Sequence, residues 1–265
     1  MMTGKVYLVG AGPGDPELLT LKAARLLRAA DAVLYDELVA PEILQLANPS
    51  AQLHNVGKRC GSKKITQEEI NFLMVGLASV GLQVVRLKGG DPLIFGRAGE
   101  EIEGLRRAGI PYEVVPGVTA ALGAAAEAGI PLTYRRGPAA VAFVTGHRAA
   151  NNEESDWRAF VRSGATLVIY MPGRNFGKIA RRLRKAGLAG QTPCALVSRA
   201  TTADQQLHVT TVGELPAAPR LAAPALLIVG EVVRLAAAQG AGFMTPAIEQ
   251  VFLQAPSLDY EELTS

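Results

Sequence analysis

Short apolar runs alternate with stretches of helical spacing up to about residue 130. The clearest helix follows Thr66, because Thr66 and Glu69 form a capping box and apolar residues recur at i, i+3, i+4 and i+7 from Ile70 to Leu77. Further helices are expected at residues 17–30, 41–47, 97–108 and 120–128. Strands are expected at residues 5–9, 32–35, 53–56, 84–88 and 112–115. This alternation predicts an α/β domain whose parallel sheet gathers its loops at one edge.

The pattern breaks at residues 134–138 (YRRGP), where we place the boundary between an N-terminal α/β domain (1–134) and a C-terminal one (138–240). Beyond it, strands expected at 140–145, 166–170, 194–198, 207–211 and 225–229 outnumber helices expected at 156–162 and 176–186. This predicts a mixed sheet with an antiparallel part. Residues 241–265 contain acids and prolines but no Lys or Arg, and we expect a loosely held acidic tail.

The charge of the chain is unevenly distributed. All 27 Lys and Arg residues lie at or before Arg234, and four of the 24 acids follow it, so residues 1–234 carry a net charge of +7. A body this positive favours an anionic partner. Aromatic residues make up only 5% of the chain, which argues against a stacking platform for nucleic acid.

The cysteines and histidines are dispersed. Cys60 and Cys194 lie in different halves of the chain, without the spacing of a metal site or a disulfide framework. We therefore expect no metal and a reducing, cytoplasmic environment. No charged leader precedes the first strand, and the most apolar segment, residues 222–230, is too short to span a bilayer, so we expect no membrane association.

Small, glycine-containing loops follow several of the expected strands. The most distinctive is Gly89-Gly90-Asp91-Pro92, where two adjacent glycines leave backbone N–H and C=O groups unscreened. Similar loops lie at residues 12–14, 116–120 and 171–173. A plain tight turn is the alternative interpretation of any one of them. Together they suit an uncharged or zwitterionic ligand held by main-chain groups at the ends of strands.

A dinucleotide site is the first alternative to consider at the N-terminus. Gly10-Ala11-Gly12 follows a strand, but Asp15 stands where the Rossmann fingerprint requires its third glycine, and Pro13 and Pro16 interrupt the turn. A carboxylate there would repel a pyrophosphate. The chain also lacks the GxxxxGK[ST] pattern of nucleoside triphosphatases.

Motifs spread over most of residues 5–230 resemble the tetrapyrrole methylase family. They are VGAGPGDPELLTLKA (9–23), LYDELV (34–39), VGKR (56–59), QEEIN (67–71), VVRLKGGDPLIFGRAGEE (84–101), VPGVTAA (115–121), TGH (145–147) and YMPG (170–173). The first motif and the GGDP loop are shared across the family. The combination of LYDELV, VGKR and GGDPLIFGR is similar to members that methylate uroporphyrinogen III twice at carbon, giving precorrin-2 for sirohaem and cobalamin synthesis.

The resemblance implies two α/β domains with S-adenosylmethionine in the cleft between them, and a homodimer. It places cofactor contacts on Pro13, Gly89, Gly90, Asp91, Ile94, Thr119, Ala120, Met171 and, in less distinctive surroundings, Ala200. It also implies a proton acceptor at Asp36 and a proton donor at Lys58. The alternative role for Asp36 is a helix cap or a partner for Lys58.

A polycarboxylate substrate requires several cations. Basic residues in or beside the expected loops would hold its carboxylates by charge-assisted hydrogen bonds. The candidates are Arg59, Arg97, Arg135, Arg136 and Arg148. The expectation concerns the group, because any single one of them is better explained as an ordinary solvated surface charge.

Three other functions are compatible with parts of this pattern. A later precorrin methyltransferase would share the cofactor loops and differ in the substrate cleft. A non-catalytic sensor would bind the cofactor or a tetrapyrrole and signal through the tail. A dehydrogenase on a degenerate dinucleotide fold would bind a nicotinamide cofactor.

Overall fold

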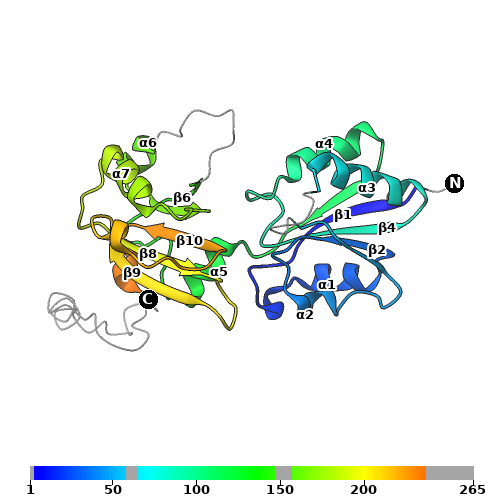
Figure 1. The fold of residues 1–265 in the computed structure, drawn as a ribbon, viewed down its shortest axis with the longest axis horizontal. Coiled ribbons are helices and arrows are strands. Elements are labelled where there is room, and N and C mark those ends of the chain that lie inside the picture. The colour runs from blue at the N-terminus through cyan, green and yellow to red at the C-terminus, as the bar shows by residue number, and fades with distance from the viewer. Residues whose placement is uncertain (1–2, 58–64, 147–156, 237–265) are drawn as a thin grey trace, which may run out of the picture.

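The computed structural model describes residues 3–57, 65–146 and 157–236. Its strands form two five-stranded sheets, one from each half of the chain, and helices cover both faces of each sheet (Figure 1). This confirms the predicted α/β class.

The first sheet is wholly parallel, as expected, with the strand order β3-β2-β4-β1-β5. Its strands are β1 (Lys5–Gly10), β2 (Ala32–Tyr35), β3 (Gln52–Asn55), β4 (Gln83–Lys88) and β5 (Tyr112–Val115). The dinucleotide fold has a different order, 3-2-1-4-5-6. All five strands end at the edge that faces the second sheet (Figure 1).

Two pairs of helices sandwich the first sheet. Helices α3 (Gln67–Ser79) and α4 (Ala98–Arg107) cover one face, and α1 (Leu21–Arg28) and α2 (Pro41–Leu44) cover the other (Figure 1). Neighbouring strand residues point to opposite faces. Val84 therefore packs with α3 and α4, whereas Val85 packs with α1 and α2.

The second sheet is mixed, as predicted. Its order is β6-β7-β10-β8-β9; the pair β6–β7 is parallel and the other three pairs are antiparallel. Its strands are β6 (Val141–Thr145), β7 (Thr166–Tyr170), β8 (Pro193–Ser198), β9 (Gln206–Thr211) and β10 (Ala225–Val229). One face packs against α7 (Phe176–Ala186), which contacts the short helix α6 (Arg158–Arg162) and the 3-10 turn η2 (Leu215–Ala217). The other face packs against α5 (Ala120–Glu127) and η3 (Glu231–Leu235).

Helix α5 precedes the expected boundary at residues 134–138 but packs on the second sheet. Ala121 and Ala124 lie in one cluster with Val168 and Ala195 of β7 and β8. The chain thus passes from one sheet to the other immediately after β5. The boundary at 134–138 stays a proposal, and the packing of α5 favours an earlier crossover.

The helix expected at residues 17–30 is wrong at its start. The structure has a 3-10 turn η1 (Pro16–Leu18), an extended Leu19, and a helix that begins only at Leu21. Thr20 sets this start, because its side chain accepts the Ala23 N–H at 3.2 Å as an N-cap. The loop after β1 is therefore longer than expected and leads first into the 3-10 turn, not directly into α1.

No helix in the described ranges has both the length and the apolar character needed to cross a bilayer. Within the same ranges, no group of three or more His, Cys, Asp or Glu side chains is placed to hold a metal ion.

Candidate active site at the strand tips

The loops after β1 and β4 start next to each other, because these two strands are neighbours at the centre of the first sheet. Gly12 and Gly90 form an isolated antiparallel bridge. The Gly90 N–H donates to Gly12 O at 2.6 Å, and the Gly12 N–H donates to Gly90 O at 3.2 Å. The two glycine loops are thus held together by their own backbones.

A third strand tip closes on the same point. A Cβ placed on Gly10 would lie 2.6 Å from both the Gly117 Cα and the Gly90 oxygen, and one placed on Gly117 would lie 2.4 Å from the Gly90 oxygen. A side chain therefore has no room at Gly10 or Gly117. Gly90 instead adopts φ +69°, which favours glycine. The expected concentration of bare main chain at the strand ends is therefore present.

Asp91 ties these loops together. Its Oδ2 accepts the Gly117 N–H at 3.1 Å, and its Oδ1 accepts the Leu93 N–H at 2.8 Å. Both carboxylate oxygens are thus engaged with main-chain donors, which holds the loop after β4 against the loop after β5.

Asp36 follows β2 and lies beside the glycine pair. Its Oδ1 accepts the Gly89 N–H at 3.3 Å and the Leu38 N–H at 3.2 Å. Asp36 therefore stands at the same edge as the expected cofactor residues. Its expected partner Lys58 lies outside the described residues, so the acceptor and donor pair stays a prediction.

A buried ion cluster supports β4 immediately before the glycine pair. The wholly buried carboxylate of Glu101 on α4 accepts hydrogen bonds through Oε1 from Lys88 Nζ at 2.9 Å and Arg86 Nε at 3.0 Å. Burial lowers the pKa of Lys88, the charge of Arg86 lowers it further, and Glu101 opposes both effects. The cluster anchors the end of β4 to the helix that follows the GGDP loop.

The loop after β1 reaches across to the second sheet. The Asp15 N–H donates to Thr201 Oγ1 at 3.0 Å, and a Cβ on Gly123 would lie 2.7 Å from Pro13 Cγ. Pro13 therefore lies against α5, and the buried Ala200 directly precedes Thr201.

The remaining expected cofactor residues lie where α5 and β7 meet the GGDP loop. Thr119 Oγ1 is 2.5 Å from the Tyr170 hydroxyl at the end of β7. Met171 follows Tyr170 with φ +49° and is 48% exposed. Ile94 and Ala120 pack against the cluster that contains Tyr170. The structure thus brings all nine expected cofactor residues to facing edges of the two sheets.

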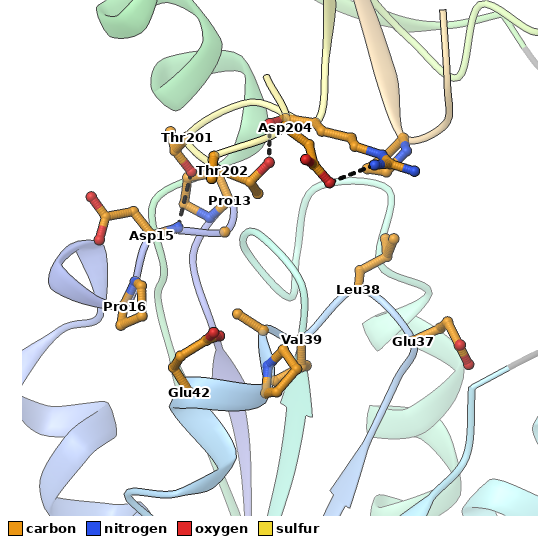
Figure 2. A pocket seen from close by; sticks show the side chains of 16 residues that line it. Pro13, Asp15, Pro16, Glu37, Leu38, Val39, Glu42, Thr201, Thr202 and Asp204 are labelled. Carbon is orange, nitrogen blue, oxygen red and sulfur yellow. Dashed lines mark hydrogen bonds and ion pairs between the residues drawn. The ribbon is translucent and has the colours of Figure 1, made fainter. Parts of the chain in front are cut away.

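A pocket of about 550 Å³ opens between the loops after β1 and β2 and the loop between β8 and β9 (Figure 2). Pro13, which is one of the expected cofactor residues, lines this pocket. Arg199 in its wall is paired with Asp204 at 2.7 Å. Its other ionisable lining residues are Asp15, Glu37 and Glu42. Among the described lining residues, Asp15 and Glu42 would repel a polycarboxylate.

Three of the five expected substrate cations lie among the described residues. Arg97 is exposed at the start of α4, and it donates hydrogen bonds to Glu100 through Nε at 2.7 Å and Nη2 at 2.6 Å. Arg135 and Arg136 are exposed in the turn closed by the Gly137 N–H to Tyr134 O bond. These three arginines are not among the lining residues of the acidic pocket. Arg59 and Arg148 lie outside the described residues.

Sequence reasoning missed the ion cluster and the contact between the Tyr170 hydroxyl and Thr119. Arg86 and Lys88 are two and four residues after Val84 in β4, so their side chains lie on the same face of the sheet as that of Val84. Helices α3 and α4 cover this face. Two bases on a buried face require a buried acid on the covering helix, which is Glu101 in the GEE sequence. Tyr170 carried no comparable signal, because its partners come from a distant segment.

The fold and this edge define an α/β protein of two sheets, with a glycine-lined candidate site where the parallel strands of the first sheet meet the second. Residues 5–216 match the family model of the tetrapyrrole (corrin/porphyrin) methylases. The chain belongs to this family, as its motifs predicted.

Individual relatives agree with the family match. The chain is 53% identical over 235 residues to siroheme synthase of Azotobacter vinelandii. The matched region covers 88% of this chain and 51% of that protein. The chain thus spans about half the length of the curated relatives it matches. The crystal structure of uroporphyrin-III C-methyl transferase from Thermus thermophilus with S-adenosylhomocysteine is 45% identical, with a TM-score of 0.76 over 88% of this chain and 100% of that one. A cobalt precorrin-4 methyltransferase is 30% identical, with a TM-score of 0.78 over 86% and 95% of the two chains.

Proposed function

We propose that this chain is an S-adenosylmethionine-dependent C-methyltransferase that converts uroporphyrinogen III to precorrin-2 by two successive methylations. The observation that carries the proposal is the meeting of Gly10, Gly90 and Gly117 at the strand tips. It occurs in a chain that is 45% identical, over 88% of its length, to a uroporphyrin-III C-methyl transferase solved with S-adenosylhomocysteine.

The residues present fit such a cofactor. A Cβ on Gly90 would lie 3.6 Å from Ala120 N and 3.9 Å from Thr119 Cα, so the unfilled position beside Gly90 faces the start of α5. Main-chain groups of Gly89–Asp91 and the N-terminal residues of α5 would hold the zwitterionic part, with Pro13, Ile94, Met171 and Ala200 supplying apolar contacts. When bound, the sulfonium supplies the methyl group.

The protein would position the two reacting atoms, exclude water from the site and supply a base that accepts a proton. An in-line reaction needs the two reacting atoms held about 3 to 3.5 Å apart in the correct orientation, and loops locked to one another by their backbones provide such rigidity. A water-poor site favours a transition state in which the positive charge is dispersed. Methylation at carbon leaves a cationic ring that must lose a proton, and Asp36 is the proposed acceptor, with Lys58 as the proposed donor.

The substrate would lie away from the acidic pocket. The carboxylates of uroporphyrinogen III would be repelled by Asp15 and Glu42, and attracted by the cations around α4 and the turn after α5. We propose that Arg97, Arg135 and Arg136, with Arg59 and Arg148, supply these contacts as a group.

The test of the function is the mass of the product. Incubation of the chain with uroporphyrinogen III and S-adenosylmethionine is expected to give a tetrapyrrole heavier by two methyl groups. No methylation of uroporphyrinogen III, with methylation of a later precorrin instead, would transfer the assignment to another member of the family.

We further propose that the enzyme works as a cytoplasmic homodimer, as the family resemblance implies. The buried free thiol of Cys194, whose pKa burial raises to about 12, is compatible with a reducing compartment.

A further inference from the structure

Tyr170 occupies a special position at the end of β7. It belongs to the second sheet, is 8% exposed, and lies beside the first residues of α5. Its hydroxyl is 2.5 Å from Thr119 Oγ1 and accepts the Ala121 N–H at 3.2 Å. One side chain of the second sheet thus binds the start of the helix that carries two expected cofactor residues.

The capping of α5 is unusual because of this contact. Thr119 is the N-cap residue, with extended φ −68° and ψ 148°, but its side chain makes no capping hydrogen bond. A threonine in this position ordinarily accepts the N–H of the second or third helical residue. Here the N–H of the second residue, Ala121, is taken by Tyr170. The tyrosine hydroxyl therefore replaces the threonine hydroxyl as the cap.

The directions of these hydrogen bonds decide whether the Thr119 hydroxyl can donate to another group. Either hydroxyl can be the donor in the 2.5 Å contact between Tyr170 and Thr119; in the proposed arrangement the Tyr170 oxygen accepts from Ala121 and donates its single proton to Thr119 Oγ1. Burial raises the pKa of Tyr170, which keeps that proton on the phenol. The proton of the Thr119 hydroxyl is then left to donate to another acceptor.

The ring of Tyr170 reaches the GGDP loop as well. Its centroid lies 4.9 Å from that of Phe95, which has φ +54° in the segment after Pro92, and 5.8 Å from that of Phe143. Met171 is the next residue in the chain. Tyr170 thus contacts or adjoins three of the loops expected to surround the cofactor.

We propose that Tyr170 is a positioning residue: it caps α5 in place of Thr119 and aims the Thr119 hydroxyl to donate a hydrogen bond to bound S-adenosylmethionine. The choice of ligand rests on the proposed function. In Tyr170→Phe the threonine would turn to cap Ala121 itself, and its hydroxyl would be lost to the ligand.

The test is the affinity of the full chain for S-adenosylhomocysteine, measured by calorimetry without tetrapyrrole. Tyr170→Phe and Thr119→Val are each expected to weaken binding about tenfold, which corresponds to one or two hydrogen bonds. The double variant is expected to be no weaker than about tenfold, because both changes remove the same interaction. A loss that multiplies to about a hundredfold, or affinity within about twofold of the original in Tyr170→Phe, would overturn the proposal.

Two conservative variants separate positioning from folding. Thr119→Ser keeps the hydroxyl and is expected to bind within about twofold of the original. Tyr112→Phe removes a hydroxyl that bonds Arg106 outside the site and is expected to change nothing. If Tyr170→Phe does not fold, equal affinity of Thr119→Val and Thr119→Ser would refute the role of the hydroxyl.

Kinetics provide a readout that a general loss of structure would not reproduce. Tyr170→Phe is expected to raise KM for S-adenosylmethionine about tenfold, with kcat and the KM for the tetrapyrrole nearly unchanged. Failure of the function assignment is recognised separately, because the original chain would then bind S-adenosylhomocysteine but leave uroporphyrinogen III unmethylated.

Discussion

Asp36 combines a structural and a proposed chemical task in one carboxylate. Its Oδ1 accepts the N–H groups of Leu38 and Gly89, which fixes the side chain beside the glycine pair. An asparagine in its place would keep an oxygen acceptor for both bonds but could not take up the proton released from the methylated ring.

Asp36→Asn is therefore expected to bind S-adenosylhomocysteine with unchanged affinity and to lose about a hundredfold or more in kcat, the usual size of general-base catalysis. Calorimetry and product formation measure the two quantities separately. A variant with the original kcat would remove Asp36 from the mechanism.

Two substitutions of Gly90 distinguish the effect of backbone strain from that of a side chain that blocks the cofactor site. At φ +69° any side chain costs about 1 to 2 kcal/mol of stability. An alanine Cβ would meet only ordinary contacts, 3.6 Å from Ala120 N, whereas a leucine would extend toward the start of α5. Both variants are expected to lose similar stability in urea, and only Gly90→Leu should lose S-adenosylhomocysteine binding. Normal binding by Gly90→Leu would exclude this loop from the cofactor site.

At the scale of elements, the contact between β4 and α4 depends on Glu101. Removing its charge would leave Arg86 and Lys88 buried without a counter-charge, and breaking such a pair costs about 3 to 5 kcal/mol. Glu101→Gln is expected to lower the free energy of unfolding by about 3 kcal/mol. The exposed Glu103 on the same helix is the matched control, and Glu103→Gln should change it by less than about 0.5 kcal/mol. Equal urea midpoints for the two variants would refute the importance of the cluster.

The pairing of β1 with β5 is reinforced by a pH-dependent contact. Glu113 on β5 hydrogen-bonds Lys22 and Lys5, which lowers the pKa of its carboxyl from 4.5 to about 2. A carboxyl with a lowered folded-state pKa stabilises the protein above its unfolded pKa and loses that contribution as the pH falls through the folded value. The stability difference between the original chain and Glu113→Gln should be constant above about pH 4.5 and shrink toward pH 2. A difference independent of pH in this window would contradict the assignment.

Across the whole molecule, most strands were predictable because they are short apolar runs bounded by glycine, proline or a charge, whereas β3 (QLHN) and β9 (QLHVTT) are largely polar. The start of α1 was not predictable, because Leu18 and Leu19 continue the apolar pattern although Thr20 caps the helix after them. The location of α5 was hidden for another reason. An alanine-rich helix fits either sheet, and only the packing of Ala121 and Ala124 against β7 and β8 decides between them.

The candidate site was predictable where it depends on local backbone. Adjacent glycines at the end of a strand indicate a site formed by main-chain groups, and Gly89 and Gly90 directly follow β4. Contacts between distant segments were not predictable. The bond from Tyr170 to Thr119 joins residues on different elements, and Arg86, Lys88 and Glu101 meet only because α4 folds back over β4.

The central claim is that main-chain groups at the strand tips of the first sheet, facing the second sheet, hold the methyl donor. A crystal structure of this chain with S-adenosylhomocysteine tests it most directly. The ligand is expected against Gly89–Asp91 and Thr119, with Met171 on its other side. Binding of the ligand elsewhere, for instance only in the acidic pocket beside Glu37 and Glu42, would contradict the account.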